Sequence, residues 1–235
     1  MTEDLPHLSV IPTRKQVKAV VLVLHGGAEH GTGRVRPWKL PYLRMIPIAR
    51  AISAAGASGG IEVRLLRNRV RGWNAPQLDP VHDARWALDR IRADHPDIPV
   101  VVVGHSLGGR VALRVADDPT VLGVCALAPW TPEDEPVQSV EGKSVLIAHG
   151  VRDQVTDPAG SYSFARRAES RTFQLARFEL GHEGHSMIRR FTLWNRLVCA
   201  FVLDVVGTVT STQAWQGIST SIWTRPVEQR LRIPL

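Results

Sequence analysis

The fold is decided by the stretch Val100-Val101-Val102-Val103-Gly104-His105-Ser106-Leu107-Gly108-Gly109-Arg110. Four consecutive valines are typical of a short buried strand, and the amphipathic run from Leu107 to Asp117 is typical of a helix. Ser106 therefore occupies a sharp turn from a strand into a helix. Gly104 and Gly108 leave room on either side of it, where a Cβ would collide with the neighbouring strand or helix. We expect this turn to expose the Ser106 hydroxyl, as a nucleophile, at the carboxyl end of a buried strand.

Two more motifs lie at the ends of apolar runs that indicate strands. Leu24-His25-Gly26-Gly27 ends the first run, and His149-Gly150-Val151-Arg152-Asp153 ends a later one. Together with the serine turn Gly104–Gly109, these motifs make the chain resemble the α/β-hydrolase superfamily over roughly residues 17–205. The resemblance implies a mainly parallel sheet flanked by helices, and a catalytic triad in the chain order Ser, Asp, His.

The same resemblance implies an oxyanion hole made of two backbone N–H groups. The N–H of Leu107, the first residue of the helix after the serine, points at an oxygen that develops charge there. The second donor is expected just after the His-Gly pair, at Gly27 or at Ala28.

Apolar runs alternate with amphipathic runs along the chain, which predicts an α/β fold. The expected strands are 17–24, 61–66, 100–103, 121–127, 144–148 and 172–180, and the expected helices are 42–55, 80–94, 107–117, 158–170 and 186–206. This alternation indicates about six strands, paired in parallel through right-handed crossovers. The site is then expected at the carboxyl ends of the strands.

The length of 235 residues, with 44% hydrophobic residues, is ordinary for one α/β domain. We expect a single domain over residues 1–235, with its core at about 17–206. Residues 207–235 form an extension rich in Ser, Thr and Gln, with Trp215 and Trp223 as its large anchors. The sequence leaves the role of this extension open.

The chain is basic, with a net charge of +7, but it carries no pattern typical of nucleic-acid binding. The Lys and Arg residues are scattered, without a long basic run or interleaved aromatic residues. We therefore expect a small-molecule acyl substrate and no nucleic-acid partner. The sequence leaves the oligomeric state open.

The N-terminal segment 1–9 carries acids and a proline where a signal peptide would carry a basic patch and an apolar run, so we expect a cytoplasmic protein. The most apolar stretch, Leu197–Val209, contains Asp204 and is shorter than the ~20 residues that a membrane span needs. Cys125 and Cys199 lie in apolar runs and are expected in the core. Because no Gly-rich phosphate motif or metal-ligand spacing occurs, we expect neither a cofactor nor a metal.

A serine nucleophile needs a histidine to take its proton and an acid to orient that histidine. Asp153, just past a predicted strand, is the expected acid. Asp134, after the preceding strand, remains an alternative, whereas Asp157 directly before Pro158 is expected to cap the next helix.

The expected base is His185, which follows Gly184 in the segment after the last predicted strand. His182 in the same segment remains an alternative. The other strand-end histidines, His25, His105 and His149, are expected to serve packing and local hydrogen bonding.

These residues indicate a serine hydrolase that cleaves a carboxylic ester or related acyl compound through an acyl-enzyme. An acyltransferase with the same triad and a non-catalytic member of the fold are the alternatives. The segment 129–142 is too short for the large lid that such proteins commonly carry there, so we expect a shallow, open site. Trp73, in the loop after the second strand, is either a wall of that site or an anchor to the core.

Overall fold

The computed structural model describes residues 5–207, 222 and 225–235, and it confirms the predicted α/β architecture. One eight-stranded sheet has the strand order β1-β3-β2-β4-β5-β6-β7-β8. The strands are β1 (His7–Ile11), β2 (Ala19–Leu24), β3 (Ile61–Arg67), β4 (Val100–His105), β5 (Val121–Leu127), β6 (Ser144–Gly150), β7 (Gln174–Leu180) and β8 (Ile233–Pro234). β1 runs antiparallel to β3, and the other neighbouring strands are parallel.

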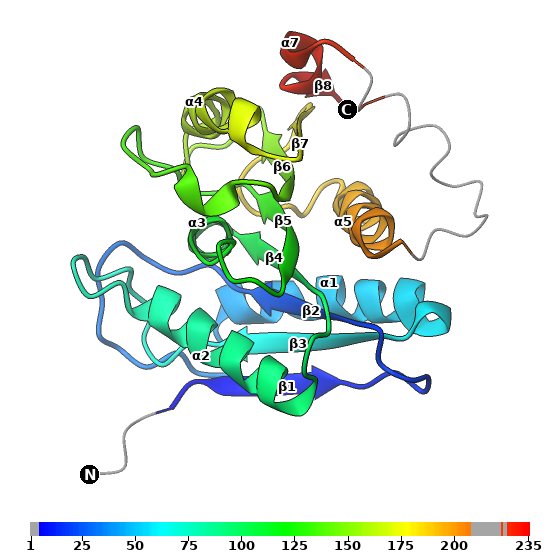
Figure 1. Ribbon diagram of the computed structural model, residues 1–235. Helices are drawn as coiled ribbons and strands as arrows, with labels where there is room; N and C mark the ends of the chain where they lie inside the picture. Colours follow the sequence, from blue (N-terminus) through cyan, green and yellow to red (C-terminus); the bar gives the residue numbers. More distant parts are fainter. Residues whose placement is uncertain (1–4, 208–221, 223–224) are drawn as a thin grey trace.

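Helices cover both faces of the sheet. They are α1 (Leu40–Gly56), α2 (Asp79–Asp94), α3 (Leu107–Arg114), α4 (Pro158–Ala168), α5 (Phe191–Val206) and the short α7 (Val227–Arg230). Figure 1 shows α1 and α5 on one face and α2, α3 and α4 on the other. In the described part of the chain, no helix combines the length and the apolar composition needed to cross a bilayer.

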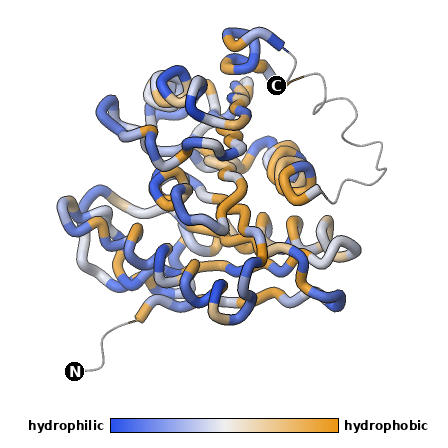
Figure 2. Tube along the Cα trace, viewed as in Figure 1, coloured by the Kyte–Doolittle hydropathy of each residue, from blue (hydrophilic) through white to orange (hydrophobic). Residues whose placement is uncertain are grey.

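Each central strand contributes to two apolar cores, because alternate side chains point to opposite faces of a sheet. In β4, Val100 and Val102 belong to the core formed with α2, α3 and α4, whereas Val101 and Val103 belong to the core formed with α1 and α5. Figure 2 shows this hydrophobic interior along the central strands and α5. Since both faces are covered, a strand can be apolar at every position, which is why four consecutive valines fit here.

The sheet has one more strand at each edge than the six that the sequence predicts. β1 is only half-buried, and β8 has two residues, so neither has the continuous apolar run of a central strand. The end of the extension is attached to β7: the Leu235 N–H donates to Glu179 O (2.9 Å), and the Gly181 N–H donates to Leu235 O (2.8 Å). Trp215 and Trp223 lie outside the described residues.

Three of the predicted helices are longer than the α-helices of the structure, and α4 ends at Ala168 rather than at residue 170. α3 ends at Arg114 rather than at Asp117, and α5 begins at Phe191 rather than at residue 186. Met187 has a φ of 58°, a left-handed conformation that an α-helix does not accept. Residues 186–190 therefore form a turn, which leaves His185 on a loop between β7 and α5.

Candidate active site

Ser106 lies in a strained turn between β4 and α3. Its φ is 58° and its ψ is −120°, a combination that few non-glycine residues adopt. A Cβ on Gly104 would lie 2.0 Å from the Gly108 carbonyl oxygen, and a Cβ on Gly108 would lie 2.6 Å from the His25 carbonyl oxygen. Both positions therefore require glycine, and the tight backbone packing holds the serine in its conformation.

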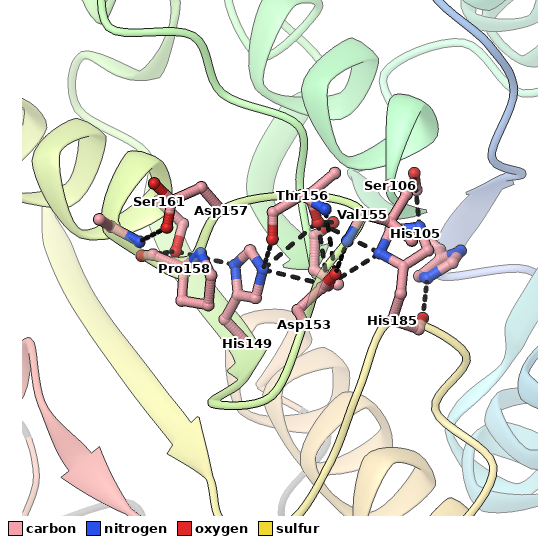
Figure 3. A network of polar contacts seen from close by, with 12 residues as sticks. His105, Ser106, His149, Asp153, Val155, Thr156, Asp157, Pro158, Ser161 and His185 are labelled. Carbon is pink, nitrogen blue, oxygen red and sulfur yellow. Dashed lines mark hydrogen bonds and ion pairs between the residues drawn. The ribbon is translucent and has the colours of Figure 1, made fainter.

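The structure brings Ser106, His185 and Asp153 into one hydrogen-bonded series (Figure 3). The Ser106 Oγ lies 2.9 Å from His185 Nε2, and His185 Nδ1 lies 2.8 Å from Asp153 Oδ2. The three residues come from the turn after β4, the loop after β7 and the loop after β6. Both distances are within hydrogen-bond reach, so a proton can pass from the serine to the histidine.

The carboxyl group of Asp153 is fully buried, and each of its oxygens accepts hydrogen bonds. Oδ1 accepts from the backbone N–H groups of Val155 (2.8 Å) and Thr156 (3.0 Å), and Oδ2 accepts from the Thr156 hydroxyl (3.0 Å). Burial alone raises the pKa of this carboxyl, but hydrogen bonds from His149, His185 and the backbone hold its pKa well below the ordinary value. Asp153 is therefore a buried carboxylate with a negative charge.

The alternative residues lie elsewhere. His182 and Asp134 are exposed on the surface. Asp157 caps α4 as expected, because its Oδ1 accepts a hydrogen bond from the Ala159 N–H (2.8 Å). Of the candidate acids and bases, the structure thus joins only Asp153 and His185 to Ser106.

The loop after β2 places Gly27 beside Leu107, as an oxyanion hole requires. A Cβ on Gly27 would lie 2.4 Å from the Leu107 side chain and 2.4 Å from the Arg71 carbonyl oxygen. The Ala28 N–H already donates to that carbonyl (2.9 Å). Of the two candidates for the second donor, Gly27 is therefore the one whose N–H is not committed to Arg71.

His25 fixes the same loop through both ring nitrogens. Its Nε2 accepts from the Asn68 N–H (3.1 Å), so the ring proton is on Nδ1, which donates to Gly26 O (2.6 Å). Burial lowers the pKa of His25 to about 4, which keeps the ring neutral near pH 7. A neutral histidine can accept one bond and donate the other, and it thereby orients the backbone before Gly27.

His105 supports the loop that carries His185. Its Nε2 donates to the His185 carbonyl oxygen (2.9 Å), and its ring packs on the His185 ring with 4.8 Å between centroids. Burial is the main cause that lowers the pKa of His105 to about 3, and the neighbouring His185 acts in the same direction.

Trp73 is an anchor to the core rather than an exposed wall. Only 3% of its surface is accessible. The guanidinium of Arg110 lies 4.0 Å from the ring centroid of Trp73 and 4.3 Å from that of Trp130. The backbone N–H of Trp130 donates to Ser106 O (3.2 Å), so the residue that carries this ring is bonded directly to the serine turn.

Two residues near the triad were missed as parts of the site by sequence reasoning. The Thr156 hydroxyl lies 3.0 Å from Asp153 Oδ2 and 3.2 Å from His185 Nδ1. His149 Nε2 lies 3.3 Å from the same carboxylate oxygen. Thr156 follows Asp153 in a plain loop sequence, and no motif marks it. Within the described ranges, no group of three His, Cys, Asp or Glu residues could hold a metal ion.

Comparison with known proteins identifies the family. A model described as "Alpha/beta hydrolase family" matches residues 20–229. The chain belongs to the α/β-hydrolase family. Monoglyceride lipase from Mus musculus is 31% identical to this α/β-hydrolase over 100 residues, and the match covers 42% of this chain and 30% of the mouse protein. The matched segment thus spans about a third of the mouse enzyme.

Solved structures share the fold of this α/β-hydrolase at low identity. An α/β serine hydrolase without a lid from Xanthomonas campestris has a TM-score of 0.62 at 18% identity, covering 88% of this chain and 91% of that one. A monoacylglycerol lipase from Paleococcus ferrophilus has a TM-score of 0.63 at 14% identity, covering 85% of this chain and 99% of that one.

Acidification should destabilise this α/β-hydrolase through His25 and His105. Their folded pKa values of about 4 and about 3 lie below the ordinary value of 6.5. The unfolded chain therefore binds more protons below about pH 6.5, and the free energy of unfolding falls as the pH falls. Thermal melts should show a decreasing Tm from about pH 7 to about pH 4. The fall of Tm with decreasing pH should be less steep in His105→Gln, because this side chain does not titrate and its amide can still donate to His185 O. An equally steep fall in the wild type and the variant would show that protonation of His105 does not contribute to the loss of stability.

Proposed function

We propose that this α/β-hydrolase is a serine hydrolase that cleaves a carboxylic ester or related acyl compound through an acyl-enzyme on Ser106. The observation that carries the proposal is the series from Ser106 Oγ through His185 to the buried Asp153 carboxylate, at 2.9 and 2.8 Å. A serine hydroxyl is a poor nucleophile near neutral pH, and this arrangement supplies the base that activates it.

The ionised Asp153 determines which nitrogen of His185 acts as the base. A carboxylate only accepts, so the proton of a neutral His185 is on Nδ1, which donates to Asp153 Oδ2 (2.8 Å). Nε2 is then unprotonated and faces the Ser106 hydroxyl (2.9 Å). The buried negative charge also stabilises the imidazolium that forms when His185 takes the proton.

In the proposed reaction, Ser106 Oγ attacks the acyl carbon while His185 Nε2 takes its proton. The carbonyl oxygen becomes negatively charged, and the N–H groups of Gly27 and Leu107 stabilise it. As the bond to the leaving group breaks, His185 returns the proton to the departing oxygen. Water then enters, gives a proton to His185 and attacks the acyl-enzyme. As the bond from the acyl carbon to Oγ breaks, His185 returns that proton to Oγ, which releases the carboxylic acid and regenerates Ser106.

The loops around the serine support a small acyl substrate. Only residues 128–143 connect β5 to β6, and they contain one short 3-10 turn, Gln138–Val140, in place of a lid. Two modest cavities are lined by residues that neighbour Ser106 and His185. One of about 240 Å³ is bordered by Gly26 and Gly27, and one of about 450 Å³ is bordered by Trp130 and Thr156.

A fluorophosphonate probe should label Ser106 and no other residue, because only a serine beside a base and an oxyanion hole attacks phosphorus readily. Mass spectrometry of the labelled peptide checks this. The Ser106→Ala protein should fold, remain unlabelled and lack turnover. An unlabelled native protein would contradict the proposal.

Matched pairs of variants test the other two roles. His185→Ala should abolish ester hydrolysis while His182→Ala keeps most of it, and Asp153→Asn should lose up to ~10⁴-fold in kcat while Asp134→Asn loses little. Steady-state kinetics with circular dichroism as the folding control provide the measurement. The reverse order in either pair would show that the role belongs to the other residue.

Short acyl chains should be preferred. A buried methylene contributes about 0.8 kcal/mol only while protein surface covers it, so the gain should stop after a few carbons. With p-nitrophenyl esters, kcat/KM should peak at acyl chains of about two to six carbons, without a jump in rate at the micellar concentration. A kcat/KM that keeps rising to long chains, or a clear interfacial activation, would show that a cover closes over Ser106.

A further inference from the structure

A second histidine contacts the carboxylate that orients His185. His149 lies near the end of β6 and has no exposed surface. Its Nε2 lies 3.3 Å from Asp153 Oδ2 and 3.1 Å from the Thr156 carbonyl oxygen. Figure 3 shows the His149 ring on the side of Asp153 opposite to His185, so that the carboxylate lies between two imidazoles.

The partners of His149 Nε2 determine that this nitrogen carries a proton. The Thr156 carbonyl oxygen accepts only, and so does the ionised Asp153 carboxylate. The Thr156 hydroxyl lies 3.4 Å from Nε2, but it donates its proton to the nearer Asp153 Oδ2 (3.0 Å). An unprotonated Nε2 would therefore place its lone pair against two acceptors inside the protein, where an unmade hydrogen bond is costly. His149 Nε2–H is therefore a donor aimed at the Asp153 side of the site.

The other ring nitrogen is held by a buried hydroxyl. His149 Nδ1 lies 2.9 Å from the Oγ of Ser161, a buried residue of α4. The buried Arg177 on β7 donates from Nε to Ser161 Oγ (3.1 Å) and from Nη2 to Pro158 O (3.0 Å). Ser161 Oγ can also donate to Pro158 O (2.9 Å), but that carbonyl oxygen already accepts a bond from Arg177, whereas the Nδ1 of a neutral His149 protonated on Nε2 can only accept and has Ser161 as its donor. The Ser161 proton can therefore point to His149 Nδ1.

With that proton placed, every donor in the series points toward Asp153. Arg177 Nε–H donates to Ser161, the Ser161 hydroxyl donates to His149 Nδ1, and His149 Nε2–H donates toward Asp153. Hydrogen bonds that share one direction strengthen one another in a low-dielectric interior. The series joins the core of the sheet, at β7 and α4, to the carboxylate next to His185.

We propose that His149 is a positioning residue that, locked in its Nε2–H tautomer by Ser161, holds the Asp153 carboxylate in the orientation that His185 needs. The inference rests on the proposed function of Ser106, Asp153 and His185. His149 itself does not contact Ser106. Its contribution acts through Asp153 Oδ2, the oxygen that also binds His185 Nδ1.

The first test compares two replacements of His149 in the full-length protein. His149→Phe keeps an aromatic ring at this position but removes the hydrogen bonds of both ring nitrogens. In this variant, kcat for a short p-nitrophenyl ester should fall about ten- to hundredfold with KM little changed. His149→Gln keeps an amide donor near the Nε2 position and should recover most of that loss. If His149 had only a structural role, kcat would not depend on whether the replacing side chain carries an N–H donor.

The second readout needs no turnover. A proton shared between His185 Nδ1 and a carboxylate gives a low-field proton NMR signal, assigned by its absence in His185→Ala. We expect this signal in the wild type and in His149→Gln, and we expect it to weaken or shift in His149→Phe. An unchanged signal together with an unchanged kcat in His149→Phe would overturn the proposal.

Ser161→Ala keeps the proposal testable if His149→Phe does not fold. This variant retains His149 but removes the donor to Nδ1, so kcat and the low-field signal should change in the same direction by a smaller amount. Ser144→Ala is the matched control, because Ser144 is a buried serine at the other end of β6. Equal effects of the two serine variants would contradict the proposal.

The two proposals can fail separately. If the wild type hydrolyses no ester and resists the fluorophosphonate probe, but the low-field signal still depends on His149, the proposed function fails and the positioning of Asp153 stands. If the wild type is active and labelled, but His149→Phe matches it in kcat and signal, only the role of His149 fails.

Discussion

The close approach of the backbone at Gly104 and Gly108 is the constraint on which the rest of the site depends. A Cβ at either position would collide with backbone atoms of α3 or of the loop after β2. This packing fixes Ser106 at a φ of 58° and sets α3 against the end of β2. It also brings Gly27 beside Leu107, so the position of the Ser106 hydroxyl and the two candidate oxyanion donors follow from one arrangement of the backbone.

The second constraint is a buried negative charge. A carboxylate inside a protein is costly unless hydrogen bonds compensate the lost water. Asp153 receives them from backbone N–H groups, the Thr156 hydroxyl and histidines on both sides. The site thus uses histidines in several distinct ways. His25 and His105 orient loops, and His149 faces the carboxylate, while His185 alone among these four contacts the serine.

The features that could be predicted from the sequence depend on local patterns. A run of valines requires a strand covered on both faces, and the glycines around Ser106 require a tight turn. The contacts between distant segments have no corresponding local pattern in the sequence. The approach of His149 to Asp153 depends on the path of the loop after β6, and the pairing of β8 with β7 involves only two residues. The start of α5 was misplaced because apolar spacing does not reveal the left-handed backbone at Met187.

The most direct test of the central claim is rapid-quench mass spectrometry of the protein mixed with a short p-nitrophenyl ester. We predict a burst of p-nitrophenol together with a protein species heavier by one acyl group, and peptide mapping should place that group on Ser106. The adduct should disappear as water hydrolyses it and should not form in Ser106→Ala. Turnover without any adduct, or an adduct on another residue, would contradict nucleophilic catalysis by the serine at this turn.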